Sequence, residues 1–209
     1  MTQGPFTVAI DGPAAAGKGT IGRAVAERFG MAHLDTGLLY RAVAAQALAG
    51  ADPVAAARSL MMVELERDDL RTPEVAQEAS RVATDPEVRR ALVDFQRKVA
   101  RQAGGAVLDG RDICTVIAPE AEVKLFVTAS AETRARRRYE ELRAKGVETS
   151  PEEVLGDVRA RDERDAGRKD APMKRAEDAL LIDTTAMGIE EAVAAAVAAV
   201  DDALRRRKG

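Results

Sequence analysis

The 209 residues are 46% apolar, which suits one or two compact domains with a substantial core. Aromatic residues make up only 3%, tryptophan is absent and the net charge is −3, so the composition argues against a nucleic-acid-binding protein. The single cysteine, Cys114, excludes an internal disulfide, no Cys/His spacing typical of zinc occurs, and without a signal-peptide core or a membrane-spanning apolar run we expect a cytoplasmic protein that does not contact membranes.

A glycine-rich stretch, Gly12–Thr20, stands between an apolar run (residues 5–11) that predicts a buried strand and helical spacing over residues 17–29. This order is typical of a phosphate-binding loop. Its glycines let backbone N–H groups point inward at an anion, and the helix N-terminus adds partial positive charge. We therefore expect the phosphates of ATP to be bound by Gly12, Pro13, Ala14, Ala15, Ala16, Gly17, Lys18, Gly19 and Thr20.

The residue after Lys18 departs from the usual motif. A Ser or Thr hydroxyl normally follows the lysine and contacts Mg²⁺, whereas here Gly19 follows it and Thr20 comes one position later. The loop alone permits ATP binding, ATP hydrolysis or phosphoryl transfer.

Residues 31–35 predict a second strand, and Asp35 and Thr36 are good caps for a helix that runs to about residue 49. His33, the only histidine, has no partner motif and is interpreted as structural. Arg41 lies on this otherwise apolar helix, where it either snorkels or binds an anion.

Three more helices are predicted before the next strand, over residues 54–60, 74–84 and 86–102; the second carries Ser80 and the third Arg89. Residues 61–71 indicate either a strand or a helix end. A strand over residues 106–109 follows and leads into Gly110-Arg111-Asp112.

The last part of the chain predicts strands over residues 122–127 and 180–183, with helices from Ser130 to about 145, from Pro151 to about 168, and from 188 to 207. Nine arginines lie between Arg134 and Arg168, which suits either a localised anion such as phosphate or a solvated helix surface.

Short apolar strands separated by helices predict an α/β fold of three layers, with a parallel sheet of about five strands covered on both faces. Ligands bind at the carboxyl ends of such strands, where Asp35, Asp109, Arg111 and the phosphate loop should meet. The long helical segment and the Arg-rich segment extend from this edge, where lids and substrate clamps are found.

Arginines at this edge favour phosphoryl transfer between two phosphate-bearing partners, because they stabilise the charge of the phosphoryl group in flight. A nucleoside monophosphate acceptor needs no general base, since its phosphate is largely ionised near pH 7. A hydroxyl acceptor would need one, and Asp35 or Asp112 would be the candidate.

Several stretches together resemble the bacterial cytidylate (CMP) kinase family of P-loop nucleoside monophosphate kinases. They are Asp11–Thr20, Leu34–Gly37 with Tyr40–Ala42, Arg71–Val75, Asp109–Asp112, Arg161–Asp165, Ala171–Lys174 and Ile182–Thr185. The resemblance implies transfer of the ATP γ-phosphoryl group to CMP or dCMP with Mg²⁺. In this family Lys-Gly-Thr is the usual form of the loop, so Mg²⁺ should be held through phosphates and water rather than by a fixed set of side chains, with Thr20 nearer the α-phosphate.

The resemblance also implies a role for each site residue. The cytosine contacts are Ser80, Arg89, Asp112 and Arg168; the ribose contacts are Arg161 and Asp165; the acceptor phosphate contacts are Thr36, Arg41 and Arg111. The catalytic residues are Lys18, Arg111, Arg161 and Arg164, with Arg134 and Arg138 nearer the ATP side.

The family's organisation divides the single domain into three parts. These are a core (1–40, 104–145 and 173–209), a nucleoside monophosphate (NMP)-binding region (41–103) and a short Arg-rich lid (146–172). The NMP-binding region is shorter than usual, since only Met61–Arg71 stands where the family has a small antiparallel sheet. Cys114 replaces a common glycine and is interpreted as a packing variation. We expect a monomer.

Two other functions stay open on the residues alone. One is a P-loop kinase acting on AMP, UMP or a hydroxyl acceptor. The other is a non-catalytic nucleotide-binding module, against which the intact Lys18 and the set of arginines argue.

Overall fold

The computed structural model describes residues 4–208 and contains one sheet of five parallel strands in the order β2-β3-β1-β4-β5. The strands are β1 (Thr7–Asp11), β2 (Ala32–Asp35), β3 (Ala106–Gly110), β4 (Val123–Thr128) and β5 (Leu180–Asp183). β1 lies at the centre, with Asp11 in register with Gly110 of β3 on one side and Phe126 of β4 on the other. The predicted fold class is confirmed, and each predicted strand lies within two residues of its expected bounds.

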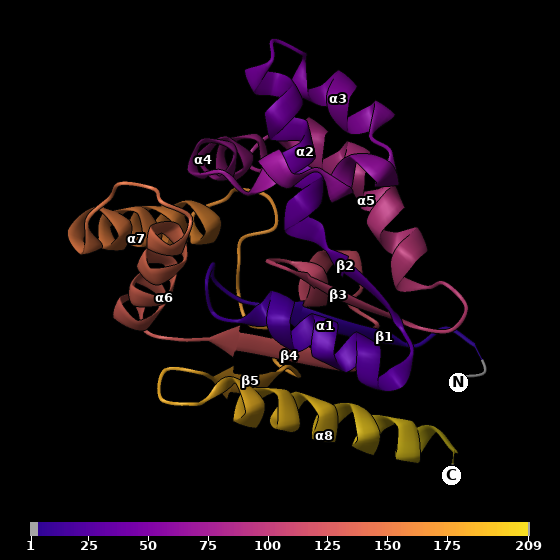
Figure 1. Cartoon of the computed structure of the whole chain (residues 1–209). Helices are drawn as coiled ribbons and strands as arrows, with labels where there is room; N and C mark the ends of the chain where they lie inside the picture. Colours follow the sequence, from indigo (N-terminus) through magenta and orange to yellow (C-terminus); the bar gives the residue numbers. More distant parts are fainter. Residues whose placement is uncertain (1–3, 209) are drawn as a thin grey trace.

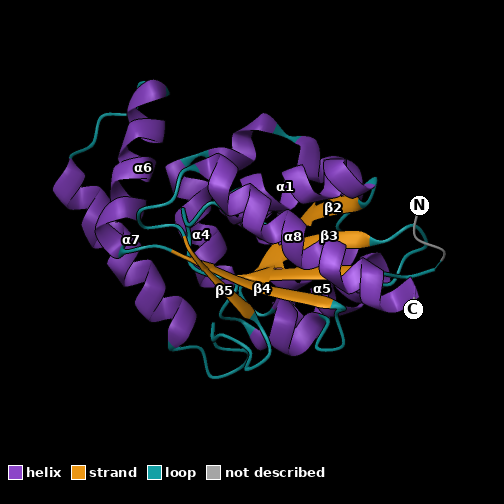
Figure 2. Cartoon of the chain, turned by 90° about the horizontal axis from the view of Figure 1, so that it is seen from below, coloured by secondary structure: helices purple, strands orange, loops and turns teal. Residues whose placement is uncertain are grey.

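Helices cover both faces of this sheet (Figures 1 and 2). On one face lie α1 (Lys18–Phe29) and α8 (Ile189–Lys208); on the other lie α2 (Thr36–Leu48) and α5 (Pro86–Ala100). Successive side chains of a strand point to opposite faces, so Val8 and Ile10 pack with α1 and α8, whereas Ala9 packs with the α2 side. Both faces of β1 are therefore buried, which explains its continuous apolar run.

The predicted NMP-binding region (41–103) lies above the sheet in Figure 1 and comprises α2 from Arg41 onward, α3 (Pro53–Ser59), α4 (Pro73–Val82) and α5. Side-chain caps at Asp52, Thr72 and Asp85 start α3, α4 and α5, each with a proline in the first turn.

Residues 61–71 form neither of the two alternatives expected from the sequence. They make two 3₁₀ turns, Met62–Glu66 and Asp68–Arg71. The Glu64 carboxylate accepts the Met61 N–H at 2.8 Å, and Leu65 and Leu70 are buried. A local cap and two apolar anchors are enough to hold this short connection.

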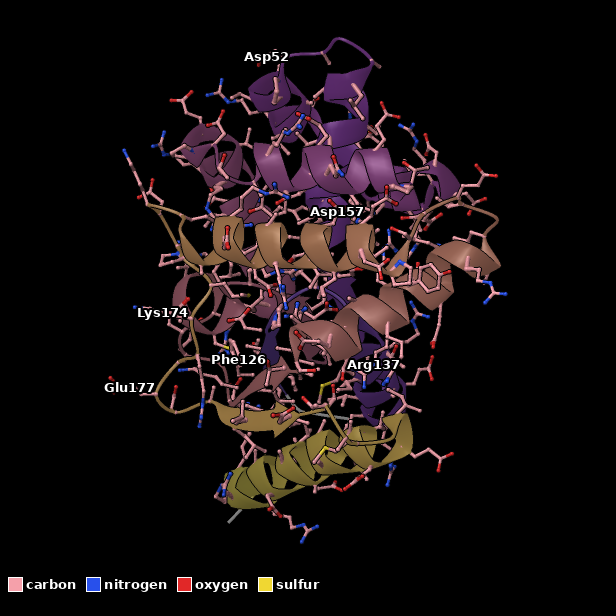
Figure 3. The ribbon with its side chains drawn as sticks, turned by 90° about the vertical axis from the view of Figure 1, so that its left-hand side faces the viewer. Asp52, Phe126, Arg137, Asp157, Lys174 and Glu177 are labelled. Carbon is pink, nitrogen blue, oxygen red and sulfur yellow. The ribbon has the colours of Figure 1, made fainter. Side chains whose placement is uncertain are left out.

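The helices α6 (Ala131–Ala144) and α7 (Pro151–Ala166) form a hairpin beside the carboxyl ends of the strands, on the opposite side of the molecule from both termini (Figure 1). Figure 3 looks onto α7, which carries Asp157 and lies between the predicted NMP-binding region and the predicted core. The hairpin has a small apolar core of its own, formed by Ala135, Leu142, Val154 and Val158. The division of the chain into core, NMP-binding region and lid stays a prediction.

One element was not expected from the sequence, a π-helical turn over Ile113–Ile117 directly after Arg111 and Asp112. In the part of the chain that the structure describes, no helix is both long and apolar enough to cross a membrane.

Candidate active site

The loop between β1 and α1 curls so that backbone N–H groups can face a common anion. Gly12 and Gly17 have φ angles of 145° and 98°, and Ala15 has a φ of 59°, which a residue with a side chain adopts only at a cost of roughly 1–2 kcal/mol. Glycine is required at position 12, because a Cβ there would lie 1.9 Å from the Val127 carbonyl oxygen. The loop leads directly into α1, and together they have the geometry of a phosphate site.

Lys18 begins α1 and is buried at the base of this loop. Its Nζ donates a hydrogen bond to the Pro13 carbonyl oxygen at 2.8 Å. Burial, together with the nearby positive charge of Arg111, lowers the pKa of Lys18 to about 7. A phosphate anion in the loop would favour the charged ammonium and raise this pKa again.

Two carboxylates, Asp35 and Asp109, end neighbouring strands close to Lys18. Asp35 caps α2 by accepting the Gly37 N–H at 3.0 Å, and burial together with the charge of Asp109 raises its pKa. Asp109 lies 2.8 Å from Nε2 of His33, a partner for the lone histidine that the sequence did not reveal. The Thr36 hydroxyl donates to the Asp109 carbonyl oxygen at 2.8 Å, which joins the start of α2 to the end of β3.

A buried ion pair between Arg89 of α5 and Asp112 lines a second part of the site. The Tyr40 hydroxyl lies 3.4 Å from the same guanidinium. Ser80 faces this pair from α4, and its hydroxyl accepts a hydrogen bond from Nε of Arg164 at 3.2 Å. Residues from α2, α4, α7 and the turn after β3 thus surround one pocket, and Arg89 of α5 contacts its lining through Asp112.

Asp165 of α7 is the acid in a cluster of arginines beside that pocket. Arg111 donates to it at 2.8 Å, and Arg168 forms a second ion pair with it. Although burial pushes the pKa of Asp165 up, Arg111, Arg168 and Arg161 hold it below its usual value. Arg161 is half-buried, its Nε is buried without a hydrogen-bond partner, and burial together with the charge of Arg111 lowers the pKa of the guanidinium to about 9. The cluster therefore has excess positive charge and favours an anion.

The largest hollow next to the phosphate loop has a volume of about 240 Å³ and is lined by Ala14, Ala15, Arg41, Arg161 and Arg164, among others. It opens between the loop, the NMP-binding region and α7. A smaller hollow of about 40 Å³ is lined by Thr36, Ser80, Arg111, Asp112, Asp165 and Arg168. Arg161 lines both hollows and so joins them.

The structure brings the expected residues together at the carboxyl ends of the strands, with two differences in detail. Arg164 lines the larger hollow but bonds to Ser80, so it bridges the lid and the NMP-binding region. Arg41 lines the same hollow while donating to the Leu70 carbonyl oxygen at 2.8 Å. The binding and catalytic roles of the site residues stay predictions.

The two arginines expected nearer the ATP side differ in burial. Arg134 is buried, lies 3.4 Å from the Ala14 carbonyl oxygen and forms a bidentate pair with Asp162 of α7. Arg138 also lines the larger hollow and pairs with Glu141.

Sequence reasoning missed Arg137, which lies on the side of α6 toward β5 and α8 (Figure 3). Its guanidinium donates to the carbonyl and the hydroxyl of Thr184 at 2.7 and 3.0 Å. With Thr20, Met187 and Ile189 it lines a hollow of about 230 Å³ on the other side of the phosphate loop. Among nine arginines in one stretch, no sequence signal distinguished this one.

Cys114 is buried against the centre of the sheet, with its sulfur 3.5 Å from the Ala9 carbonyl oxygen. Burial and the charge of Asp11 raise the pKa of the thiol. A buried, protonated thiol is a poor nucleophile, so the position supports the packing interpretation.

A phosphate loop at the centre of a parallel three-layer sheet, facing a cluster of arginines, defines a P-loop phosphotransferase of the small-molecule kinase class. Two solved structures share the fold at low sequence identity. An uncharacterized protein from Eubacterium ventriosum has a TM-score of 0.58 at 14% identity and covers 94% of this chain and 98% of its own. A gluconokinase from Sinorhizobium meliloti has a TM-score of 0.51 at 16% identity and covers 96% and 94%.

The sequence identifies the family within this class. The family model for cytidylate kinase matches residues 8–202, and the chain belongs to the cytidylate kinase family. A cytidylate kinase of Cereibacter sphaeroides is 65% identical over 204 residues, which cover 98% of each chain. One of Azorhizobium caulinodans is 55% identical over 202 residues, covering 94% of this chain and 98% of its own. The resemblance drawn from the motifs is therefore confirmed.

Proposed function

We propose that the protein transfers the γ-phosphoryl group of ATP to CMP or dCMP, giving ADP and CDP or dCDP. Family membership supports this activity. At the site, the observation that carries it is the convergence of the phosphate loop with Arg41, Arg161 and Arg164 on one hollow. An enzyme that only binds or hydrolyses ATP has no need of a second anion site facing the first.

The donor nucleotide lies along the phosphate loop. The curled backbone of Gly12–Gly17 and the start of α1 hold its phosphates, and Lys18 neutralises the outer ones. The hollow lined by Arg137, Thr184 and Met187 adjoins the loop, and we assign it to the base and ribose of ATP.

The residues present fit Mg²⁺ in the way the resemblance implies. Among residues 4–208 no three His, Cys, Asp or Glu side chains come together as a metal site. Mg²⁺ is commonly held by substrate phosphates and waters with one or two carboxylates, and Asp35 and Asp109 lie at the loop to supply them. When bound, Mg²⁺ neutralises charge on the β- and γ-phosphates.

The acceptor lies in the smaller hollow, with its phosphate toward the larger one. Thr36, Arg41 and Arg111 bind the phosphate, and Arg161 and Asp165 bind the ribose. Cytosine contacts Ser80, Arg89, Asp112 and Arg168. Asp112 accepts from the exocyclic amino group, whereas uracil would present a carbonyl to the same carboxylate and be disfavoured.

The acceptor phosphate attacks the γ-phosphorus in line, and the bond to the β–γ bridging oxygen breaks to release ADP. No general base is needed, because a phosphate monoester with a second pKa of about 6 is largely ionised at pH 7. Lys18, Arg111, Arg161 and Arg164 stabilise the charge that spreads over the moving group.

Acceptor binding requires the site to open. The acceptor hollow measures about 40 Å³, whereas small-molecule pockets typically begin near ~300 Å³. Its polar lining groups are already paired: Asp112 with Arg89, Asp165 with Arg111 and Arg168, and Ser80 with Arg164. Residues 146–172 would swing away as a lid and close over bound CMP, exchanging these pairs for contacts with the nucleotide. We also propose that the protein acts as a monomer in the cytoplasm.

The first test incubates the purified protein with MgATP and CMP and quantifies ADP and CDP by chromatography. We expect ADP and CDP to appear in equal amounts, with little ADP formed when CMP is left out. ADP without CDP would mean an ATPase, and the absence of both ADP and CDP would mean a binding module.

A further inference from the structure

Asp11 is a buried acidic residue that takes no part in the proposed mechanism. It ends the central strand β1, directly before the phosphate loop, and its side chain is fully buried. Its Oδ1 accepts the Ile113 N–H and its Oδ2 accepts the Cys114 N–H, each at 2.8 Å. One carboxylate thus binds two successive N–H groups at the start of the π-helical turn, about a hundred residues away in sequence.

Both ends of this connection lead into functional segments. On one side, the residue after Asp11 is Gly12, whose Cα is packed so closely on Val127 that no side chain fits. On the other side, Ile113 follows Arg111 and Asp112, the residues assigned to the acceptor phosphate and to cytosine. The Asp11 backbone is in register with both β3 and β4, so it is fixed in the middle of the sheet.

The chemistry of the position is unfavourable for a residue that serves packing alone. Burial raises the pKa of Asp11 to about 6 even though two backbone N–H groups and the Cys114 thiol oppose the shift. A buried carboxylate is costly where an apolar residue could pack. An apolar side chain at position 11 could not accept hydrogen bonds from the Ile113 and Cys114 N–H groups, which belong to the turn after β3 and not to the sheet.

We infer that Asp11 is a positioning residue that fixes the acceptor-binding turn, Gly110–Cys114, relative to the phosphate loop. Through the two N–H groups it sets where Arg111 and Asp112 stand with respect to the ATP phosphates. Phosphoryl transfer is sensitive to such placement. The inference rests on the proposed function, because it assigns Arg111 and Asp112 to the acceptor.

The test compares Asp11→Asn with Thr7→Val, a matched control at the other end of the same strand. Asparagine keeps one acceptor oxygen and turns an amide group toward the second N–H. Thr7 is equally buried and donates to the Ala100 carbonyl oxygen at 2.5 Å, so its replacement also removes a buried hydrogen bond, far from the acceptor turn.

We expect Asp11→Asn to raise KM for CMP by about tenfold, the effect of one lost buried hydrogen bond, and to reduce the preference for CMP over UMP. KM for ATP should change little. Thr7→Val should lower Tm and leave both KM values unchanged. A folded Asp11→Asn protein with wild-type KM for CMP and wild-type preference would overturn the inference.

Hydrogen exchange on the wild-type protein keeps the inference testable if the Asn variant does not fold. The amides of Ile113 and Cys114 should be as strongly protected as those of β1, with and without CMP. Fast exchange at both amides would overturn the inference. Failure of the proposed function would look different, since the wild-type protein would then not phosphorylate CMP at all.

Discussion

Asp165→Asn tests the arginine cluster at the acceptor pocket. Asp165 is 1% exposed and pairs with both Arg111 and Arg168. Removing one partner of a buried ion pair costs about 3–5 kcal/mol, because the other charge is left buried without compensation. We expect a cost at the lower end of this range, because Arg111 and Arg168 line the pocket and solvent can reach them when the pocket opens.

A loss of about 3 kcal/mol is a large share of the roughly 5–15 kcal/mol that stabilises a domain. For a chain of this length each kcal/mol shifts Tm by about 2–4 °C, so the expected fall in Tm is roughly 6–12 °C. Circular dichroism melts would measure it. Lys124–Asp178 provides the control, because it is also a close pair, at 2.7 Å, but Asp178 is 66% exposed. Asp178→Asn should cost less than about 1 kcal/mol.

A second measurement separates the charge effect from a general packing defect. The Asn variant has one more uncompensated positive charge in the cluster, so sulfate should raise its Tm more than it raises the wild-type Tm. KM for CMP should also rise, since Asp165 is assigned to the ribose. A fall in Tm no larger than that of Asp178→Asn, or an equal response to sulfate, would refute the account of the cluster.

Three further predictions concern Lys18 and Asp112. Lys18→Ala should abolish CDP formation with an unchanged circular dichroism spectrum; a variant that keeps wild-type turnover would remove Lys18 from the mechanism. Because the pKa of Lys18 is about 7 in the free protein and ATP favours the charged form, ATP binding should take up a proton, and the Kd of ATP measured by calorimetry should rise roughly fivefold to tenfold from pH 7.5 to 8.5. If the Kd of ATP rose by the same factor over this pH range in Lys18→Ala, the pH dependence would belong to another group. Asp112→Asn can turn an amide donor toward the uracil carbonyl, so the ratio of kcat/KM for CMP to that for UMP should fall at least about tenfold; an unchanged ratio would exclude Asp112 from cytosine recognition.

The sequence was sufficient for the fold because its local signals agree with the tertiary structure. Residues 6–11 and 106–109 of the predicted apolar runs are buried in a parallel sheet that is covered on both faces. Asp52, Thr72 and Asp85 each precede a proline and cap the helix that follows. The motifs also indicated that the phosphate loop and the residues predicted to bind the acceptor lie together at one edge of the sheet.

What the sequence could not give depends on contacts between distant residues. The π-helical turn after Asp112 forms where Asp11 accepts two of its N–H groups, and nothing near residue 113 signals that partner. The lone His33 pairs with Asp109, 76 positions away. Residues 61–71 lack a periodic pattern, and their 3₁₀ turns follow from the burial of Leu65 and Leu70.

The ion pairs at the acceptor pocket could not be predicted from the sequence either. Motif matches assigned Asp165 to ribose and Asp112 to cytosine, but they do not say that each carboxylate is already paired with an arginine when the pocket is closed. The same is true of Arg164, whose bond to Ser80 depends on how α7 lies against α4.

The most direct test of the central claim is a competition for the acceptor site. Equal concentrations of CMP, dCMP, UMP and AMP are incubated in one tube with limiting MgATP and wild-type protein, and the diphosphates are separated and quantified at low conversion. We expect CDP and dCDP together to predominate, with UDP a minor product and AMP essentially unused. Phosphorylation of AMP or UMP ahead of both cytidine nucleotides would contradict the claim.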